Sequence, residues 1–488
     1  MQRNDLCLQG FEWYLKANGR FWENMRAIAP SFRSLGIDIL WLPPAYKGMA
    51  GANDVGYGVY DLYDLGEFSQ KGTVRTKYGT KDEYLSLIKT CHDNDIAVMA
   101  DIVMNHRLGA DAPEKSRGRK KKQENRMIPI SEDRDIESWT RFTFPGRNGT
   151  YSTFVWDQSC FNGVDYDNMR QLKAIHLLDG RMWNMNVDKE NGNFDYLMGC
   201  NVDVKNPRVA KELIRWGKWY CDTTGIDAFR MDAVKHIGFD FMEEWIKEMR
   251  RHTGREMFAC GEYWHGDVAR LDAYLSNAHR VMSLFDVSLH FKLFDVSQQG
   301  QRFDLRHVFD GTLVGRDPFH SVTFVDNHDT EPGQSLESFV KDWFKPMAYA
   351  LILLRIDGLP CVFYGDLFGI PAKGIAPIEK LRTLMRLRYL CAYGTQHDYF
   401  ESTSAGWTRE GVQEYPESGL AVLFSTGGHV ERRMYVSQRH AGKTFVDALG
   451  SGATVVIDAN GCGVFHVGGG TIAAYALSDA LEEIWLHA

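Results

Sequence analysis

Short, continuous apolar segments that alternate with helix-like segments are the feature that most restricts how this chain can fold. A continuous apolar segment is typical of a parallel strand that is buried on both faces. The strand-like segments span residues 37–42, 96–103, 226–231, 257–260, 322–325 and 361–364, with weaker ones at 6–12 and 284–287. The helix-like segments span residues 21–35, 81–93, 207–223, 239–252 and 339–356. Repeated strand–helix units with right-handed connections predict an α/β fold, a (β/α)8 TIM barrel.

Two regions interrupt this alternation. Residues 105–206 are polar and irregular, and they are too many for an ordinary loop, so they predict a β-rich domain inserted after strand 3. From residue 399 onward, strands alternate with glycine-rich turns, which indicates a C-terminal antiparallel β-sandwich. The expected division is a catalytic barrel of residues 1–104 and 207–398, an inserted domain of 105–206 and a sandwich of 399–488. A length of 488 residues is in line with roughly three modules.

The charge balance and the lengths of the apolar stretches bear on two classes of partner, nucleic acids and membranes. The chain has 56 Lys and Arg against 64 Asp and Glu, a net charge of −8, so it lacks the basic footprint of a general nucleic-acid-binding protein. The basic run within residues 115–122 is interpreted as a solvated loop of the inserted domain, with contact to a polyanion as the alternative. The longest apolar stretch, residues 348–354, is far too short to span a membrane. We expect a monomer that binds neither nucleic acid nor a membrane.

Nine cysteines are scattered along the chain without a C-x-x-C pair. This pattern argues against a disulfide framework and against a zinc ribbon. The first residues lead into a strand-like segment without the apolar region of a secretory signal. Together these features predict a cytoplasmic protein with reduced thiols.

Polar residues gather at the carboxyl ends of four expected strands. They lie within residues 101–106, 225–236, 259–264 and 324–329. The reactive groups of a barrel enzyme sit at this end of the strands. A charge at the end of an apolar strand costs desolvation free energy, so four such clusters indicate an active site rather than a requirement of folding.

Three of these strand ends carry a carboxylate, namely Asp232, Glu262 and Asp329. A retaining glycoside hydrolase needs a nucleophilic carboxylate and a protonated carboxylic acid about 5–5.5 Å apart. The fourth and fifth strands are neighbours, so Asp232 and Glu262 can meet that spacing. Arg230 shares a strand face with Asp232 and is expected to keep it ionised. Apolar surroundings beside Trp264 are expected to raise the pKa of Glu262, as an acid catalyst requires.

These four segments carry a family resemblance. The sequences D-I-V-M-N-H, G-I-D-A-F-R-M-D-A-V-K-H, G-E-Y-W and F-V-D-N-H-D resemble, in order and spacing, the signature regions of the α-amylase family of glycoside hydrolases. Residues 37–46, 54–79, 191–198, 343–366 and 406–411 are also similar to the bacterial liquefying and cytoplasmic α-amylases, so the resemblance covers almost the whole chain. It implies an endo-acting, retaining hydrolase of α-1,4-glucosidic bonds in starch, glycogen or maltodextrins.

The resemblance also implies roles for individual residues. Asp232 matches the nucleophile, Glu262 the general acid and then base, and Asp329 the carboxylate that binds sugar hydroxyls and helps to distort the ring. The implied binding residues are His106 and His328 at the transition state, Arg230 beside the nucleophile, Tyr57 beneath the reacting sugar, Lys235, His236 and Trp264 on the leaving-group side, and Gln9 and Trp13 on the opposite side.

A structural Ca²⁺ between barrel and inserted domain is a further implication of the resemblance. The matching ligands are Asn105, Asp195, Asn201 and the backbone carbonyl of His236. The positions that match an additional metal cluster of secreted relatives hold Asn162, Asn184, Asp203 and Lys205. Because Ca²⁺ prefers oxygen ligands with ample negative charge, amides in place of carboxylates should weaken binding. We expect one weakly held Ca²⁺ and no second cluster, with the Lys205 ammonium as a substitute for a cation's charge.

Other functions remain as alternatives. A maltooligosaccharide-preferring or transglycosylating relative would share the three carboxylates and differ in the loops around the cleft. A non-catalytic carbohydrate-binding relative should have lost carboxylates, whereas all three are present. A zinc hydrolase built on His106, His236 and His328 lacks an H-E-x-x-H motif and leaves the carboxylates without a role.

Overall fold

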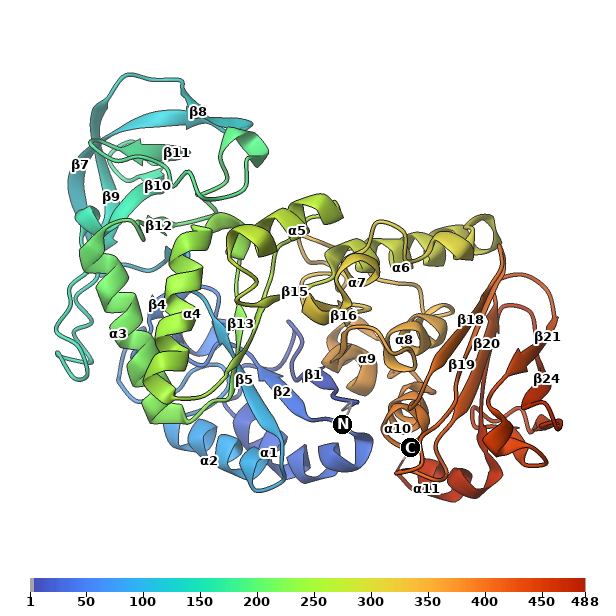
Figure 1. Cartoon of the computed structure of the whole chain (residues 1–488). Helices are drawn as coiled ribbons and strands as arrows, with labels where there is room; N and C mark the ends of the chain where they lie inside the picture. Colours follow the sequence, from blue (N-terminus) through green and yellow to red (C-terminus); the bar gives the residue numbers. More distant parts are fainter. Residues whose placement is uncertain (1–3, 488) are drawn as a thin grey trace.

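The computed structural model describes residues 4–487, and a closed barrel of parallel strands lies at its centre (Figure 1). In hydrogen-bonded order its strands are β1 (Cys7–Gln9), β17 (Leu359–Phe363), β16 (Ser321–Phe324), β15 (Ser283–Phe285), β14 (Phe258–Gly261), β13 (Ala228–Met231), β5 (Ala97–Ile102) and β2 (Ile39–Leu42). Nearly every residue of these strands is buried, which explains why their sequences are mostly apolar. The predicted (β/α)8 barrel is confirmed.

Helices cover the outside of the barrel. They include α1 (Phe21–Phe32), α2 (Lys81–His92), α3 (Pro207–Thr224), α4 (Phe239–Thr253), α5 (Val268–Asn277), α6 (Val287–Gln299), α7 (Leu313–Arg316), α8 (Lys345–Leu353) and α10 (Leu381–Cys391). In α3, Asn206 caps the first turn with its side chain, Pro207 occupies that turn, and Gly225 ends the helix in the left-handed conformation. Leu213 and Trp216 are on its buried face.

One predicted helix is shorter than expected. The pattern predicted a helix over residues 339–356, but α8 begins only at Lys345 and ends at Leu353. The backbone amide of Val340 donates to the carboxylate of Asp326 at 3.2 and 3.3 Å, and this contact anchors the non-helical segment before α8. Pro346 lies in the first turn of α8, where the missing N–H costs no hydrogen bond.

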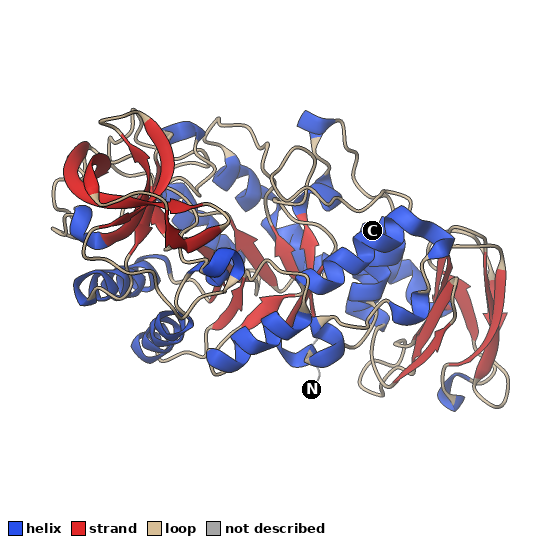
Figure 2. Ribbon diagram, turned by 90° about the horizontal axis from the view of Figure 1, so that it is seen from above, coloured by secondary structure: helices blue, strands red, loops and turns tan. Residues whose placement is uncertain are grey.

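A β-rich unit is inserted between β5 and α3, on one side of the barrel (Figure 2). Its strands are β6 (His106–Arg107), β12 (Cys200–Val202), β10 (Phe161–Asp167), β11 (Leu172–Leu178), β7 (Ala112–Lys122) and β8 (Asn125–Pro129), with β9 (Arg134–Arg141) paired to β7. The predicted β-rich insertion is confirmed.

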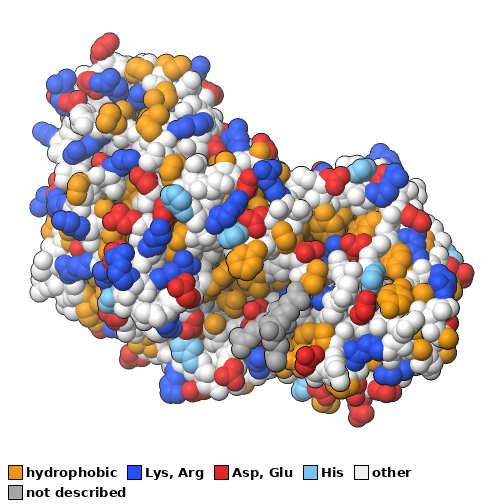
Figure 3. Space-filling view, in the orientation of Figure 1, with side chains coloured by type: hydrophobic (Ala, Val, Ile, Leu, Met, Phe, Trp, Pro, Cys, Tyr) orange, Lys and Arg blue, Asp and Glu red, His pale blue; other side chains and the backbone are white. Residues whose placement is uncertain are grey.

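The basic run lies in strand β7, so its interpretation as a loop was wrong. Strands β9 and β11 pair with β7 on its two sides, and this hydrogen-bonded ladder fixes the backbone although the side chains are charged. Arg119 pairs with Asp133 at 2.5 Å and Arg117 with Asp135 at 3.8 Å. Basic and acidic side chains both lie on this part of the surface (Figure 3), and the two ion pairs give Arg117 and Arg119 an acidic partner.

The C-terminal part folds as two antiparallel sheets at the other side of the barrel (Figure 2). The larger sheet has the order β18 (Gln396–Phe400), β19 (Ser404–Arg409), β20 (Leu420–Ser425), β25 (Ile472–Leu477), β22 (Thr444–Asp447) and β23 (Thr454–Val456), and the smaller one pairs β21 (Val430–Tyr435) with β24 (Cys462–Val467). Leu423, Met434, Phe445 and Phe465 share one hydrophobic core between the sheets. The predicted antiparallel sandwich is confirmed.

All nine cysteines are free thiols, and eight of them are buried. Within residues 4–487, no helix combines the length and the apolar character needed to cross a membrane.

Candidate active site

The polar strand ends converge on one cleft of about 600 Å³. The predicted residues that line it are Trp13, Tyr57, His106, Asp232, Lys235, His236, Glu262, Trp264, His328 and Asp329. Gln9 and Arg230 do not line the cleft, but both are buried in contact with residues that do. The structure therefore brings the predicted catalytic and sugar-binding residues together at one end of the barrel.

Arg230 is the centre of the site's charge network. It lies on β13 and is almost completely buried. Its Nη1 contacts Oδ1 of Asp232 at 2.6 Å and Oδ1 of Asp101 at 3.0 Å, and its Nη2 contacts Oε2 of Glu262 at 2.9 Å. One guanidinium thus gathers carboxylates from β5 and from the ends of β13 and β14.

Burial raises the pKa of each of the three predicted carboxyl groups, while the positive charge of Arg230 opposes the rise. The pKa of Glu262 is raised to about 7, with the negative charge of Asp232 adding to the effect of burial. The pKa of Asp329 is raised to about 6. That of Asp232 is also raised, although two interactions with Arg230 counteract burial. Glu262 is therefore the carboxyl group best suited to carry a proton near neutral pH.

Three stacked rings form one wall of the cleft. The rings of Trp13 and Tyr57 are 5.9 Å apart and parallel within 2°, and His328 stacks on Tyr57 at 5.2 Å. Nε2 of Gln9 lies 2.9 Å from Nδ1 of His328, so the buried Gln9 side chain contacts the His328 ring. Burial and the positive charge of Arg230 together lower the pKa of His328 to about 3, which keeps the ring neutral.

Asp101 is a site residue to which the sequence reasoning assigned no role. Its Oδ2 accepts hydrogen bonds from the hydroxyl of Tyr57 at 2.9 Å and from the indole of Trp41 at 3.1 Å. It pairs in strand register with Arg230 on the neighbouring strand. The available signal was its position, because a carboxylate at the end of buried β5 needs a positive partner.

The rest of the cleft lining combines predicted residues with others that the sequence analysis did not identify. The ammonium of Lys235 donates to the carbonyl of Trp264 at 3.1 Å and pairs with Glu190 at 2.5 Å. The unpredicted lining residues include Glu190, Phe194, Met198, His265, Phe291 and Leu336. Glu190, Phe194 and Met198 come from the irregular end of the insertion, where no periodic pattern marks their orientation.

The three histidines of the zinc alternative make hydrogen bonds to other protein groups, in the case of His328 to Gln9. Nε2 of His106 lies 2.8 Å from the carbonyl of Tyr57, and Nδ1 of His236 lies 2.6 Å from the carbonyl of Phe194. Burial lowers the pKa of His106 to about 4 and that of His236 to about 3. Among residues 4–487, no three His, Cys, Asp or Glu side chains form a group suited to a metal ion.

Two of the residues predicted to bind calcium, Asp195 and Asn201, lie in a buried hydrogen-bonded cluster with Asn162 and Asn184, in which amides outnumber carboxylates. Oδ2 of Asp195 accepts from Nδ2 of Asn162 at 2.7 Å and from the backbone amide of Asn184 at 2.9 Å. Nδ2 of Asn201 donates to Oδ1 of Asn162 at 2.8 Å. Oδ1 of Asn201 and Nδ2 of Asn105 are buried without a partner among the described residues. One carboxylate and a free amide oxygen fit a single, weakly held cation.

Lys205 pairs with a carboxylate outside the predicted metal ligands. Its ammonium pairs with Asp240 at 3.4 Å, and both side chains are about half exposed.

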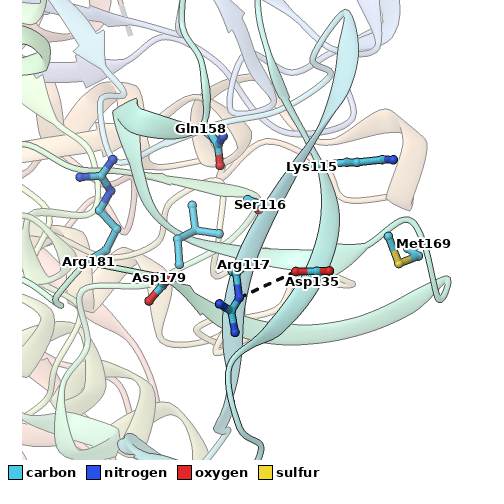
Figure 4. Close-up of a pocket in the computed structure, with 9 residues that line it drawn as sticks. Lys115, Ser116, Arg117, Asp135, Gln158, Met169, Asp179 and Arg181 are labelled. Carbon is cyan, nitrogen blue, oxygen red and sulfur yellow. Dashed lines mark ion pairs between the residues drawn. The ribbon is translucent and has the colours of Figure 1, made fainter.

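A second hollow, of about 540 Å³, lies on the inserted domain (Figure 4). Its lining is mostly charged, and the guanidinium of Arg117 points toward Asp135 on the neighbouring strand (Figure 4). Asp179 and Arg181 line its other side. None of the strand-end segments of the barrel contributes to it.

The comparison with known proteins agrees with this geometry. The family model of the α-amylase catalytic domain matches residues 30–380. The chain is 49% identical to the α-amylase of Geobacillus stearothermophilus, over 97% of this chain and 87% of that protein. It is 40% identical to the cytoplasmic α-amylase of Escherichia coli K12, over 98% of this chain and 100% of that protein. It is 46% identical to the glucan 1,4-α-maltohexaosidase of Bacillus sp. strain 707, over 97% of this chain and 92% of that protein.

Solved structures show the same fold. An α-amylase from Anoxybacillus superimposes with a TM-score of 0.66 over 98% of each chain, at 17% identity. The fold, the convergent carboxylates, the family model and the full-length relatives all agree, and the chain belongs to the α-amylase family of glycoside hydrolases.

Proposed function

We propose that this chain is an endo-acting, retaining α-amylase that hydrolyses internal α-1,4-glucosidic bonds of starch, glycogen or maltodextrins. The observation that carries the proposal is that Asp232 and Glu262 bind one guanidinium, that of Arg230, at 2.6 and 2.9 Å. Two carboxyl groups on one guanidinium lie close together. This supports the retaining separation of about 5–5.5 Å over the inverting separation of about 6.5–9.5 Å.

In the proposed reaction, the protonated Glu262 donates its proton to the glycosidic oxygen while Asp232 attacks the anomeric carbon. The bond to the leaving sugar breaks, and an ester forms between Asp232 and the glucan. The ionised Glu262 then takes a proton from water, which attacks the same carbon and frees Asp232. Asp329 binds sugar hydroxyls beside the reacting ring. A pKa of Glu262 near 7 supports its role as the proton donor.

The two walls of the cleft suggest how the glucan chain lies. Trp13 and Tyr57 present stacked rings to the sugars before the cleaved bond, and Lys235, His236 and Trp264 meet the leaving-group side. Apolar ring faces bind the apolar faces of sugar rings, whereas the charged groups bind hydroxyls. His106 and His328, both neutral, supply hydrogen bonds at the reacting sugar.

We propose one Ca²⁺ site and no second metal cluster. Asn105, Asp195, Asn201 and the backbone carbonyl of His236 would hold the ion, which would neutralise the buried Asp195 and join barrel and insertion. The buried, unpartnered Oδ1 of Asn201 supports a cation here. The small number of carboxylates supports weak binding.

A second candidate function is the release of oligosaccharides of defined length, or their transfer to other sugars. The relative from Bacillus sp. strain 707, which is named a maltohexaosidase, favours the first of these. The products formed from starch, resolved by chain length over time, distinguish the two candidates.

The remaining proposals concern the setting of the protein. Nine free thiols and the cytoplasmic E. coli relative support a cytoplasmic location. We also propose that the protein is a monomer. We propose that it is divided into a barrel (1–104 and 207–398), an inserted domain (105–206) and a sandwich (399–488).

The test of the proposed function is hydrolysis of starch by the wild type and by Asp232→Asn. The change is nearly isosteric, so the folded protein should persist while starch hydrolysis is lost. The wild type should first release products of the α configuration, which NMR detects before mutarotation. Inversion of configuration, or near-native starch hydrolysis by Asp232→Asn, would overturn the assignment. A wild type that binds starch without cleaving it would identify a carbohydrate-binding relative instead.

A further inference from the structure

A buried glutamate joins the loop that carries Asp329 to the aromatic wall of the cleft. Glu331 follows Asp329 by two residues, and its side chain has no exposed surface. Its Oε1 accepts a hydrogen bond from the backbone amide of Trp13 at 2.8 Å. Its Oε2 is buried and has no hydrogen-bond partner in the part of the chain that the structure describes. An ionised carboxylate with an unsatisfied buried oxygen is costly, so this geometry favours the neutral acid.

The charges around Glu331 favour the same form. Glu12 faces it from the N-terminal segment, Asp329 from its own loop, and Lys373 from the short 3-10 turn of residues 371–373. Burial raises the pKa of Glu331 to about 9, and the negative charges of Glu12 and Asp329 contribute to this rise. The Trp13 amide and the ammonium groups of Lys373 and Lys77 favour the ionised form, but they do not cancel this rise in the pKa.

The backbone of Trp13 is held at both its amide and its carbonyl. Glu331 accepts from its amide, and the ammonium of Lys77 donates to its carbonyl at 3.0 Å. The hydroxyl of Tyr14 binds the carbonyl of Pro332 at 2.7 Å, which ties the same two segments together a second time. These bonds place the Trp13 ring parallel to Tyr57 in the wall of the cleft.

We propose that Glu331 is a positioning residue whose neutral carboxyl group fixes Trp13 in the sugar-binding wall. When Glu331 loses its proton, a third negative charge appears beside Glu12 and Asp329, and the side chain that carries it is fully buried. Oε2 can then be hydrated only if the loop that contains residues 329–331 moves away from Trp13. Alkaline solution should therefore weaken glucan binding on this side of the cleft. This inference rests on the proposed function, because it assigns Trp13 to sugar binding.

The test measures binding directly, so that it does not depend on turnover. Calorimetry gives the Kd of maltoheptaose between pH 6 and pH 10 in the Asp232→Asn background, with and without a second change at Glu331. Glu331→Gln keeps the shape and an acceptor for the Trp13 amide but cannot ionise. We expect its Kd at pH 6 to match that of the background. Its Kd should then stay nearly constant up to pH 10, whereas the Kd of the background rises through pH 9.

Glu331→Ala removes the acceptor and should raise the Kd about 2–10-fold already at pH 6, as expected for one lost hydrogen bond. If Glu331 acts through Trp13, adding Glu331→Ala to Trp13→Ala should cause little further change. Two results would overturn the inference: an alkaline rise in Kd that persists in Glu331→Gln, or additive effects of the two alanine variants. Failure of the proposed function has a different signature, namely no measurable maltoheptaose binding in the background protein at pH 6.

Discussion

The hydroxyl of Tyr57 donates a hydrogen bond of 2.9 Å to Oδ2 of Asp101, and Oδ1 of the same carboxylate binds Arg230 at 3.0 Å. Asp101 therefore couples the aromatic wall of the cleft to the guanidinium that Asp232 and Glu262 share. A change at Asp101 should disturb sugar stacking and the carboxyl pair together, although Asp101 itself does not line the cleft.

Asp101→Asn and Tyr57→Phe separate these two effects. Asp101→Asn removes one of the buried counter-charges of Arg230, and we expect a loss of about 3 kcal/mol in the free energy of unfolding together with a lower kcat. Tyr57→Phe keeps the ring and removes one hydrogen bond, so it should cost only about 1 kcal/mol. Urea unfolding measures the stability of the two variants, and steady-state kinetics on maltoheptaose measure their kcat. A stability of Asp101→Asn equal to that of the wild type would show that Asp101 is not needed to balance Arg230.

The proton on Glu262 should set the alkaline side of the activity profile. Its pKa is about 7, so the proton donor is present below that pH and is lost above it, and kcat/KM on starch should fall as pH rises through 7. Glu262→Gln should lower kcat about 10²–10⁴-fold, the usual contribution of a general acid. Substrates whose leaving group needs no protonation, such as a glucosyl fluoride, should lose far less. Equal losses on starch and on the fluoride would contradict the role of proton donor.

The sequence determined much of the barrel because eight strands buried on both faces must be apolar along their length. It also placed Asp232, Glu262 and Asp329 at one end, since parallel strands in a barrel share the direction of their carboxyl ends. Start points of helices were harder to predict. The residues before Lys345 have a helical pattern, yet they are not helical in the structure, and a contact from outside the segment, between the Val340 amide and the carboxylate of Asp326, anchors them.

Other parts of the site depend on contacts that no local pattern records. Glu190 reaches the cleft from the insertion through its ion pair with Lys235, which is 45 positions away in the chain. The strand β7 looked like a loop because its side chains are charged, whereas its conformation comes from pairing with β9 and β11. Both features follow from tertiary contacts rather than from residue periodicity.

The calcium cluster predicts a gain of affinity from one substitution. Asn201→Asp adds a carboxylate beside Asp195, and because Ca²⁺ affinity rises with ligand charge, the Kd for Ca²⁺ should fall. Without Ca²⁺ the same variant should be less stable than the wild type, since two buried carboxylates then repel each other. Titration calorimetry with Ca²⁺ and thermal unfolding with and without a chelator measure these effects. Asn18→Asp, at an exposed position, is the matched control and should change neither quantity. Two or more Ca²⁺ ions per chain after dialysis would contradict the single weak site.

The most buried ion cluster of the barrel should dominate the stability of this region. The ammonium of Lys345 lies 3.0 Å from Asp326 and also pairs with Asp366, and all three side chains are fully buried. Lys345→Met leaves two buried carboxylates without a counter-charge, so we expect a loss of about 3–5 kcal/mol at pH 8. In the variant these carboxylates can be neutralised by protons, so the loss should shrink as pH falls toward 5.

The control for this cluster is Lys89→Met, which removes an exposed pair with Asp93 and should cost no more than about 1 kcal/mol. Urea unfolding of both variants at pH 5 and pH 8 gives the comparison. Because Asp326 also accepts from Thr330, next to Asp329, Lys345→Met should lower kcat as well as stability. A loss in Lys345→Met that equals the loss in Lys89→Met, at both pH values, would show that the buried ammonium is not what keeps Asp326 and Asp366 in place.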